Sequence, residues 1–235
     1  MFNSRLFKKL RRWLLYLLCS LLLLSMLPVL LLRWFDPNTS SFMLQYQWKH
    51  SSNQVLDYQW RDWGQLSAQL KIAVVAAEDQ KFPVHYGFDF KSIMDALKQR
   101  QQGQSSRGAS TISQQVVKNM WLWSGPSWVR KGFEAWLTIV LETVCSKQRI
   151  LEIYLNVAQW GNGQFGAQAA SQHYFKKNAI QLNRYEAALL AAVLPNPVRF
   201  RVDSPTQYTR DRQRWILDQI ASLGGAGYLS DISRE

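Results

Sequence analysis

Residues 78–89 read EDQKFPVHYGFD, and residues 108–119 read GASTISQQVVKN. Carboxylate, imidazole, hydroxyl, amide and ammonium groups are concentrated in this stretch, which lies between apolar runs of helical spacing. Such a density of reactive side chains is typical of a functional site held between packed helices. The stretch therefore predicts a helical fold arranged around a polar site.

An apolar helix precedes this stretch. Its apolar positions recur at helical spacing and are Leu66, Leu70, Ala73, Val74 and Ala77. The helix is expected to end near Glu78, which places that carboxylate at a helix end facing a loop. Asp89 can cap a further helix, with Ile93, Met94 and Leu97 on its buried face. The polar run 99–107 then predicts a break and a mobile loop.

The rest of the chain also has helical periodicity. Thr111 and Gln114 fit a capping box, so a helix is predicted from Ser110 or Thr111 to about Trp123. Apolar spacing and Gly or Pro breaks predict further helices over 128–144, 147–157, 167–175, 184–194 and 209–223. No alternating strand pattern of any length occurs, which indicates a mainly α domain.

The N-terminus has the composition of a membrane anchor. Residues 1–12 contain five basic residues and no acid, and residues 13–32 carry no charge. A helix of about 20 residues reaches roughly 30 Å, the thickness of a bilayer core. A cleaved signal peptide is the alternative, but no small-residue cleavage site follows the apolar run. The basic residues predict that the N-terminus lies in the cytoplasm and that everything after Arg33 lies outside.

These features divide the chain into four parts. We expect a cytoplasmic basic tail at 1–12, a transmembrane anchor at 13–32, a membrane-proximal connector at 33–65 and the main domain at 66–235. The formal net charge is +12, and removal of the five N-terminal charges leaves +7 on the exported part. This charge favours an anionic partner, and an external location disfavours nucleic acid. The two cysteines form no disulfide framework, and no Cys/His cluster has zinc spacing.

Three groups of residues could carry chemistry. Glu78, at the mouth of an apolar helix, could be desolvated enough to act as a general base; alternatively it is a solvated acid, or is paired with Lys81. Asp79 and His85 have equally plain structural interpretations. The helix start at 110–119 offers unpaired amides that suit a phosphate, with Thr111, Gln114, Gln115 and Lys118 on one broad face. That face could equally be the solvated side of a helix.

Arg130 and Glu134 are spaced at i and i+4, which is typical of a surface ion pair. In the alternative interpretation Glu134 is a second functional acid, with Arg130 and Lys131 as phosphate ligands. Two carboxylates suggest glycosyl-bond chemistry without specifying which kind. The nearby run from Val116 to Trp128 is rich in Trp, and it could be either core packing or an interfacial patch in the outer leaflet.

Assembled in this order, the motifs resemble those of the monofunctional biosynthetic peptidoglycan glycosyltransferases, glycosyltransferase family 51. That family shares its domain with the class A penicillin-binding proteins. The similarity covers roughly Ile72–Leu223 and the N-terminal anchor, and it rests on EDQKFPVHYGFD, GASTISQQVVKN, RKGFE (130–134) and KQRILEIYLN (147–156). It implies a mainly α, lysozyme-like glycosyltransferase domain of two lobes, the smaller facing the membrane, behind a transmembrane helix.

The resemblance also implies a reaction and roles for residues. The enzyme would polymerise lipid II into β-1,4 glycan strands, with inversion and release of undecaprenyl pyrophosphate. Glu78 would be the general base on the acceptor 4-hydroxyl, supported by Asp79, Phe82 and His85. The pyrophosphate would be held or neutralised by Glu134, Lys118, Arg130 and Lys131. The donor site would be shaped by Ser110, Thr111, Gln114, Gln115 and Asn119.

No cofactor and no resident metal are implied, although a divalent cation at the pyrophosphate would be compatible with this chemistry. The implied partners are lipid II, the growing glycan chain, membrane lipid and other cell-wall synthesis proteins, with no nucleic acid. The implied location is the bacterial cytoplasmic membrane, with the catalytic domain on the periplasmic side. The alternatives are a lysozyme-like lytic enzyme that uses Glu78 as a general acid and a non-catalytic cell-wall scaffold.

One position departs from the family pattern. Many relatives carry an arginine four residues before the position of Arg130, where this chain has Pro126. If that arginine touches phosphate, this chain has lost one contact. Reduced donor affinity is then expected rather than inactivity.

Overall fold

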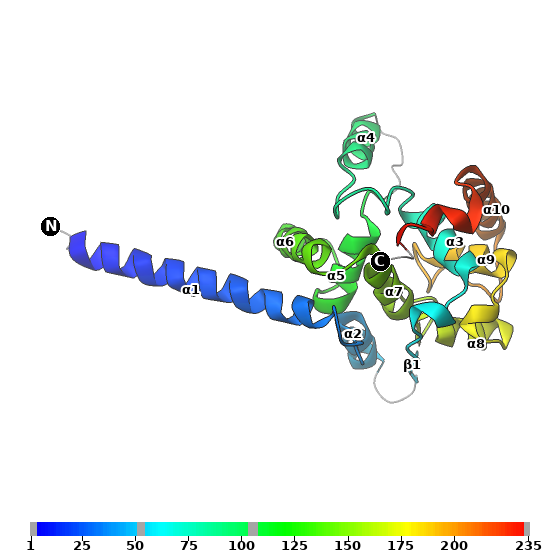
Figure 1. The fold of residues 1–235 in the computed structure, drawn as a ribbon, viewed down its shortest axis with the longest axis horizontal. Helices are drawn as coiled ribbons and strands as arrows, with labels where there is room; N and C mark the ends of the chain where they lie inside the picture. Colours follow the sequence, from blue (N-terminus) through cyan, green and yellow to red (C-terminus); the bar gives the residue numbers. More distant parts are fainter. Residues whose placement is uncertain (1–3, 51–54, 103–107, 233–235) are drawn as a thin grey trace.

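The computed structural model of the chain describes residues 4–50, 55–102 and 108–232. Figure 1 shows a helical domain from which one long helix projects. The α-helices in the described ranges are α1 (Ser4–Leu31), α2 (Ser41–Lys49), α3 (Ala68–Glu78), α4 (Phe90–Gln101), α5 (Ile112–Trp121), α6 (Trp128–Val144), α7 (Lys147–Val157), α8 (Ala167–Phe175), α9 (Arg184–Val193) and α10 (Gln207–Ser222). The predictions of a mainly α domain and of α3 and α5–α10 are confirmed, with the predicted ends two or fewer residues away.

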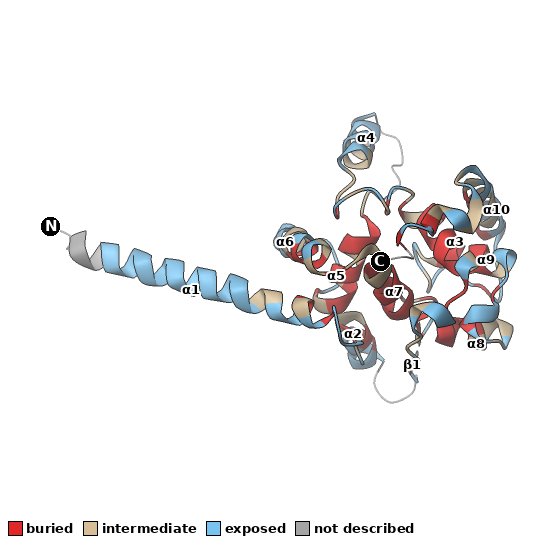
Figure 2. Cartoon of the chain, in the orientation of Figure 1, coloured by how far each residue is buried: buried red, intermediate tan, exposed pale blue. Residues whose placement is uncertain are grey.

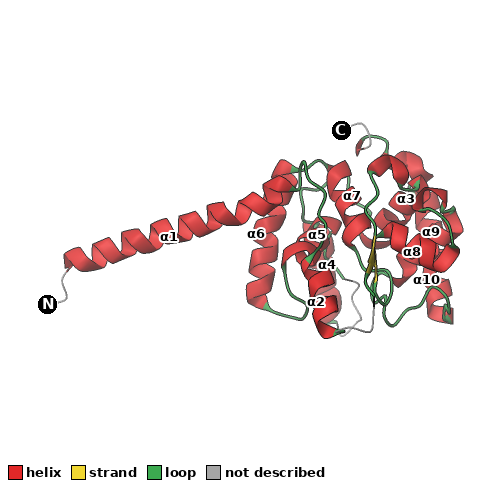
Figure 3. Cartoon of the chain, turned by 90° about the horizontal axis from the view of Figure 1, so that it is seen from below, coloured by secondary structure: helices red, strands yellow, loops and turns green. Residues whose placement is uncertain are grey.

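The projecting helix is α1. Its stretch Lys8–Leu31 has a mean hydropathy of 2.5 and is long and apolar enough to cross a membrane. Most of its described length contacts no other part of the domain and is exposed, as Figure 2 shows. Only the C-terminal end is packed: Val29 and Leu32 are buried, and the end of the helix lies beside α6 in Figure 3. An apolar helix exposed in this way needs a nonpolar surrounding, which a bilayer supplies.

The larger lobe is built on α3, which packs against α9 and α10. Leu70, Ile72, Ala73, Val74 and Val75 are all fully buried, so α3 is covered on every side. Ala-rich α9 lets its neighbours approach closely. The smaller lobe packs α5 against α6, α7 and α2, and α7 also contacts α8, so it lies between the lobes.

The predicted connector, in its described residues 33–50 and 55–65, contains short regular elements that pack on the domain. Ser40 caps α2 by accepting from the amide of Met43, and Met43 and Tyr46 are buried. The short strand β1 (Asp57–Tyr58) pairs in parallel with β2 (Gln164–Phe165). A nine-residue helix and a two-residue strand are too short to show a period in the sequence, and their stability comes from the distant elements they contact.

The helix α4 differs from its prediction. It was expected to bury Ile93, Met94 and Leu97, but Ile93 is only partly buried and Met94 is exposed; the side chain of Leu97 lies outside the described set. The helix stands apart from the lobes in Figure 1. Asp89 caps it as predicted, by accepting from the amide of Ser92 at 3.1 Å. The helix continues to Gln101, and the remainder of the predicted loop, 103–107, lies outside the described residues.

Candidate active site

The candidate site lies where the two lobes meet, between the end of α3 and the side of α5. Glu78 is the last residue of α3, and its Oε2 accepts a hydrogen bond of 2.9 Å from Nε2 of Gln115. The Oε1 of Gln115 accepts in turn from the hydroxyl of Tyr154, on α7, at 3.1 Å. Burial raises the pKa of the Tyr154 hydroxyl, which keeps that hydroxyl protonated. The two hydrogen bonds therefore run from Tyr154 through Gln115 to Glu78.

The surroundings of Glu78 favour its protonated form. Burial raises the pKa of the carboxyl, and the charge of Asp79 adds a smaller push in the same direction. The hydrogen bond from Gln115 and the charges of Arg212 and Lys118 oppose the rise without cancelling it. Of the interpretations that the sequence left open for Glu78, these surroundings favour the desolvated carboxyl over the solvated acid. A raised pKa suits a group that must take a proton at neutral pH.

Two neighbours of Glu78 were not assigned correctly from the sequence. The suggested partner Lys81 instead pairs with Asp89 at 2.9 Å. Arg212, on α10, is the residue that sequence reasoning missed: its Nη2 donates to the carbonyl of Ala77 at 2.9 Å, and its charge acts on Glu78. Nothing local marks Arg212 as functional, because it stands in a charged surface-type helix 134 positions after Glu78. Only the packing of α10 on α3 brings the two together.

Asp79 holds the start of α5 in place. Its buried carboxylate accepts hydrogen bonds from Nε2 of His85 at 2.9 Å and from the backbone amide of Ile112 at 2.9 Å. The amide of Gly87 donates to Nδ1 of His85 at 3.1 Å, so the proton of the neutral ring lies on Nε2 and is donated to Asp79. These contacts make Asp79 and His85 a clamp between the loop after Glu78 and α5.

Gly87 and Phe82 hold the same loop against its neighbours. Gly87 has φ +82°, and a Cβ there would lie 2.7 Å from Cγ2 of Thr138, so a side chain is excluded by both conformation and space. The hydroxyl of Thr111 donates to the carbonyl of Gly87 at 2.6 Å. Phe82 is fully buried, and its ring lies edge-on to His85 at a centroid distance of 6.2 Å. The loop is thus rigidly attached to α5 and α6.

The start of α5 is not the open anion site that the sequence suggested. Thr111 and Gln114 form the predicted capping box, and both are buried. The amide of Ile112 is occupied by Asp79, and the amide of Gln114 by the hydroxyl of Thr111. Since the protein's own groups already accept from these two amides, they are not open to an anion. The four polar residues predicted to share one face of α5 therefore have two different roles. Thr111 and Gln114 act inside the fold, while Gln115 and Lys118 face the junction.

The second acid lies on α6. Glu134 is only 2% exposed; its Oε2 accepts from Nη1 of Arg130 at 2.9 Å, and its Oε1 is paired with the ammonium of Lys131. The predicted i, i+4 ion pair between Arg130 and Glu134 is present, but it is not a surface pair, because its acid is buried. The Nε of Arg130 is also buried and has no hydrogen-bond partner among the described residues. An unused buried donor beside two cationic groups is the arrangement expected where an anion binds.

Lys118 joins the two halves of the site. Burial lowers the pKa of its ammonium, while Glu134 and Glu78 raise it and Arg130 and Lys131 lower it. Lys118 is thus within electrostatic reach of both acids, yet it forms no ion pair within the described part of the chain. A cation placed between two acids but bound to neither is available to an incoming anion.

The remaining predicted residues have lesser contacts. The hydroxyl of Ser110 lies 3.4 Å from Nζ of Lys131, at the edge of the cationic cluster. Asn119 is buried, one residue beyond Lys118. The members of the Trp-rich run differ in their burial. Val116, Val117, Met120 and Leu122 are buried core, whereas Trp123 is exposed and Trp128 is 93% exposed.

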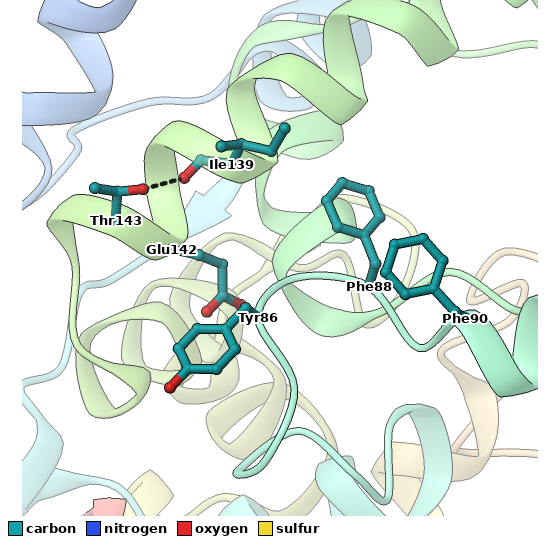
Figure 4. A pocket seen from close by; sticks show the side chains of 6 residues that line it. All are labelled: Tyr86, Phe88, Phe90, Ile139, Glu142 and Thr143. Atoms are coloured by element: carbon teal, nitrogen blue, oxygen red, sulfur yellow. Dashed lines mark hydrogen bonds between the residues drawn. The ribbon is translucent and has the colours of Figure 1, made fainter.

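A pocket lies beside the Gly87 loop, and Figure 4 shows the residues that line it: Tyr86, Phe88, Phe90, Ile139, Glu142 and Thr143. Its volume is about 450 Å³. The rings of Phe88 and Phe90 are stacked 5.9 Å apart. Glu142 at its base is bound by Lys147 at 2.8 Å and by the hydroxyl of Ser113. Across the described ranges, no group of three or more His, Cys, Asp or Glu could hold a metal ion.

The chain belongs to the transglycosylase family: the sequence model of that family matches residues 47–221. It is similar to the biosynthetic peptidoglycan transglycosylase of Stutzerimonas stutzeri (strain A1501), at 50% identity over 219 residues that cover 92% of this chain and 90% of that relative. The protein of the same description from Pseudomonas aeruginosa is 46% identical over 232 residues, with 97% and 98% covered. That from Shewanella oneidensis is 46% identical over 218 residues, with 92% and 94% covered.

These findings confirm the resemblance drawn from the motifs and the mainly α, lysozyme-like fold. The chain is an enzyme with peptidoglycan glycosyltransferase activity. Glycan and lipid-linked precursor are the corresponding substrate class, and the apolar helix α1 fits a membrane-anchored enzyme.

Proposed function

We propose that the enzyme polymerises lipid II by an inverting displacement, with Glu78 as the base and the cluster on α5 and α6 as the binding site for the leaving pyrophosphate. The observation that carries the proposal is the contrast between the two acids. Glu78 has a raised pKa and one neutral hydrogen-bond donor, whereas Glu134 lies buried against two cations. One end of the site is prepared to take a proton, and the other to hold an anion.

In this reaction Glu78 removes the proton from the 4-hydroxyl of the acceptor sugar as that oxygen attacks the anomeric carbon of the donor. A new glycosidic C–O bond forms, and the bond between the anomeric carbon and the pyrophosphate breaks. The electron pair leaves with the pyrophosphate, and attack from the opposite face converts the α-linkage into a β-1,4 linkage. The Tyr154–Gln115 chain holds the Glu78 carboxylate toward the acceptor.

The leaving group develops negative charge, which Lys118, Arg130 and Lys131 are placed to neutralise. The Nε of Arg130 and the ammonium of Lys118, which have no hydrogen-bond or ion-pair partner among the described residues, supply the donors, and Glu134 orients Arg130 and Lys131. Fixed cations aimed at developing charge are the largest usual contribution to catalysis. The proposal requires no cofactor, and a divalent cation bound with the pyrophosphate would add charge that the protein already provides.

The anchor supports a membrane-bound arrangement. We place the N-terminus inside and the domain on the periplasmic face of the cytoplasmic membrane, because the basic residues precede the span. The helix α6 lies beside the last turns of α1, where Nε1 of Trp136 donates to Oγ of Ser25 at 3.1 Å. Exposed Trp123, Trp128 and Phe133 then face the outer leaflet, which suits their preference for the headgroup region. A lipid-linked donor can reach α6 without leaving the membrane.

The test is glycan-chain formation from labelled lipid II by the full-length protein, in buffer with and without a chelator such as EDTA. We expect polymer that lysozyme digests, and a rate that EDTA leaves within about twofold. Loss of the rate in EDTA would mean that a metal ion supplies charge the cations do not. Digestion of finished peptidoglycan without polymer formation would replace the proposal with the lytic alternative.

A further inference from the structure

Arg149, in the first turn of α7, binds the residues that directly follow the membrane helix α1. Its Nε donates to the carbonyl of Leu32 at 2.8 Å, and its Nη2 donates to the carbonyl of Phe35 at 2.9 Å. The same guanidinium pairs with Asp36 at 2.8 Å. Three successive contacts therefore run from one side chain to residues 32–36, directly after α1 ends at Leu31.

The guanidinium is itself held from the domain side. Its Nη1 pairs with Glu152 at 2.7 Å, and its Cζ lies over the ring of Trp60, 5.1 Å from the ring centroid. The planar fork of arginine can satisfy several acceptors in a fixed geometry, which a lysine ammonium cannot do. The carbonyls that Arg149 binds, those of Leu32 and Phe35, belong to the turn that follows α1, so this one side chain holds the backbone where it leaves the helix.

A reciprocal contact runs the other way. Nη1 of Arg33, on the anchor side, donates to the carbonyl of Val144, the last residue of α6. Together with the Trp136–Ser25 bond, these contacts tie both α6 and α7 to the final turns of α1. We call residues 32–36 with Arg149 the anchor joint. Because the joint is hydrogen-bonded throughout, α1 is fixed to the domain instead of being a flexible tether.

The joint bears directly on the site, because α6 also carries the cationic cluster. Glu134 lies two residues before Trp136, a rise of roughly 3 Å along the helix. The position of the span in the bilayer therefore determines the height of Arg130 and Lys131 above the membrane. A pyrophosphate attached to a membrane-embedded chain is confined to the headgroup level, so this height matters for its capture.

We propose that Arg149 is a positioning residue, which fixes the height and tilt of the active site over the membrane so that a membrane-embedded pyrophosphate donor meets the cluster on α6. The proposal rests on the proposed function for the nature of the donor. It assigns Arg149 no contact with the substrate. Its loss is therefore expected to matter when the donor is held in a bilayer and to matter little when the donor diffuses freely.

The experiment compares full-length Arg149→Ala with the wild type on two substrates. One is lipid II in vesicles containing the reconstituted enzyme, and the other is a short-chain lipid II analogue in detergent micelles. We expect the vesicle rate to fall at least about tenfold, as for a misplaced reacting group, and the micelle rate to change less than about threefold. The loss is expected as a higher apparent KM for surface concentration of substrate. Arg149→Lys, which cannot span the same acceptors, is expected to fall in between.

Arg201→Ala is the matched control, since Arg201 pairs with Asp203 on the exposed surface far from the joint in sequence. It is expected to keep the wild-type ratio of vesicle to micelle rates. Equal losses in both media for folded Arg149→Ala would overturn the proposal, as would no loss in either. If Arg149→Ala does not fold, the double variant Arg33→Ala, Asp36→Ala replaces it, because this variant weakens the joint from the anchor side only. The same vesicle and micelle rates are measured, and the same outcomes support or overturn the proposal. A wild type inactive on both substrates would instead refute the proposed function.

Discussion

Glu78 and Glu134 are the same residue type on two sides of one junction, yet their surroundings are opposite. Glu78 ends a mostly apolar helix that is covered by the domain, and a neutral amide is its hydrogen-bond donor. Glu134 is buried more deeply but is paired with Arg130 and Lys131. Burial without a paired cation raises the pKa of Glu78, while burial with two cations leaves a charged cluster. The difference shows how one site prepares one acid to accept a proton and the other to organise cations.

The comparison predicts the largest effect at Glu78. Glu78→Gln keeps the size and the hydrogen bond but cannot accept a proton, so the polymerisation rate is expected to fall by about 10³-fold or more. The rate would be measured with labelled lipid II. Glu186→Gln is the matched control, because glutamine can still close the capping box at the start of α9. Full activity of folded Glu78→Gln would remove Glu78 from the role of base.

The same variant has a second, independent readout. The folded chain holds the Glu78 proton more tightly than the unfolded chain, because the pKa is raised on folding. This contribution to stability is present below the unfolded pKa and is lost as the pH rises through the folded pKa. Glu78→Gln is therefore expected to have a higher Tm than wild type at pH 7, with the advantage shrinking toward pH 4. A lower Tm at pH 7 would contradict the desolvation of Glu78.

Glu134 should respond in the opposite way. Glu134→Gln leaves Arg130 and Lys131 without their shared counter-charge, and removal of one partner of a buried ion pair costs about 3 kcal/mol. We expect a clear fall in Tm, part of which inorganic pyrophosphate restores by binding the freed cations. Calorimetry with and without pyrophosphate would measure both. An unchanged Tm would show that the cluster does not depend on Glu134.

Lys118 connects the two acids, so Lys118→Met tests both halves at once. Loss of a cation at the leaving group is expected to lower kcat/KM by about 10²-fold. The charge of Lys118 also lowers the pKa of Glu78. Without it, the acid limb of the pH–rate profile should move to higher pH, since Glu78 must be ionised to act. A loss of rate with an unmoved acid limb would separate Lys118 from Glu78.

The smallest predicted effect is at Pro126, one turn before Arg130 in an exposed loop. Pro126→Arg adds a cation near the cluster and is expected to lower the KM for the donor by about threefold without changing kcat, as an exposed charge contact would. Pro126→Lys serves as a control for charge without the planar fork. If neither variant changes substrate affinity, the missing arginine is not a phosphate ligand.

Much of the fold was predictable because its signals are local. The capping box of Thr111 and Gln114, the cap at Asp89 and the apolar spacing of α3 each depend on residues within one or two helical turns. Predictions failed where a tertiary contact decided the outcome. The helix α2 was not predicted because its stability depends on packing against the distant α5, and the predicted burial of α4 was wrong because periodicity shows an apolar face without showing what covers it.

The sequence by itself determined the helices, the membrane span, the family motifs and the identity of both acids, because helix periodicity, capping and hydropathy act over short distances along the chain. Only the tertiary structure decided how the acids differ. It placed Arg212 close to Glu78, occupied the amide of Ile112 with Asp79, and buried Glu134 beneath its two cations. It also joined Arg149 to the end of α1. The physical reason is that desolvation and charge depend on neighbours in space, and the neighbours that distinguish the two acids are brought together by packing from distant parts of the chain.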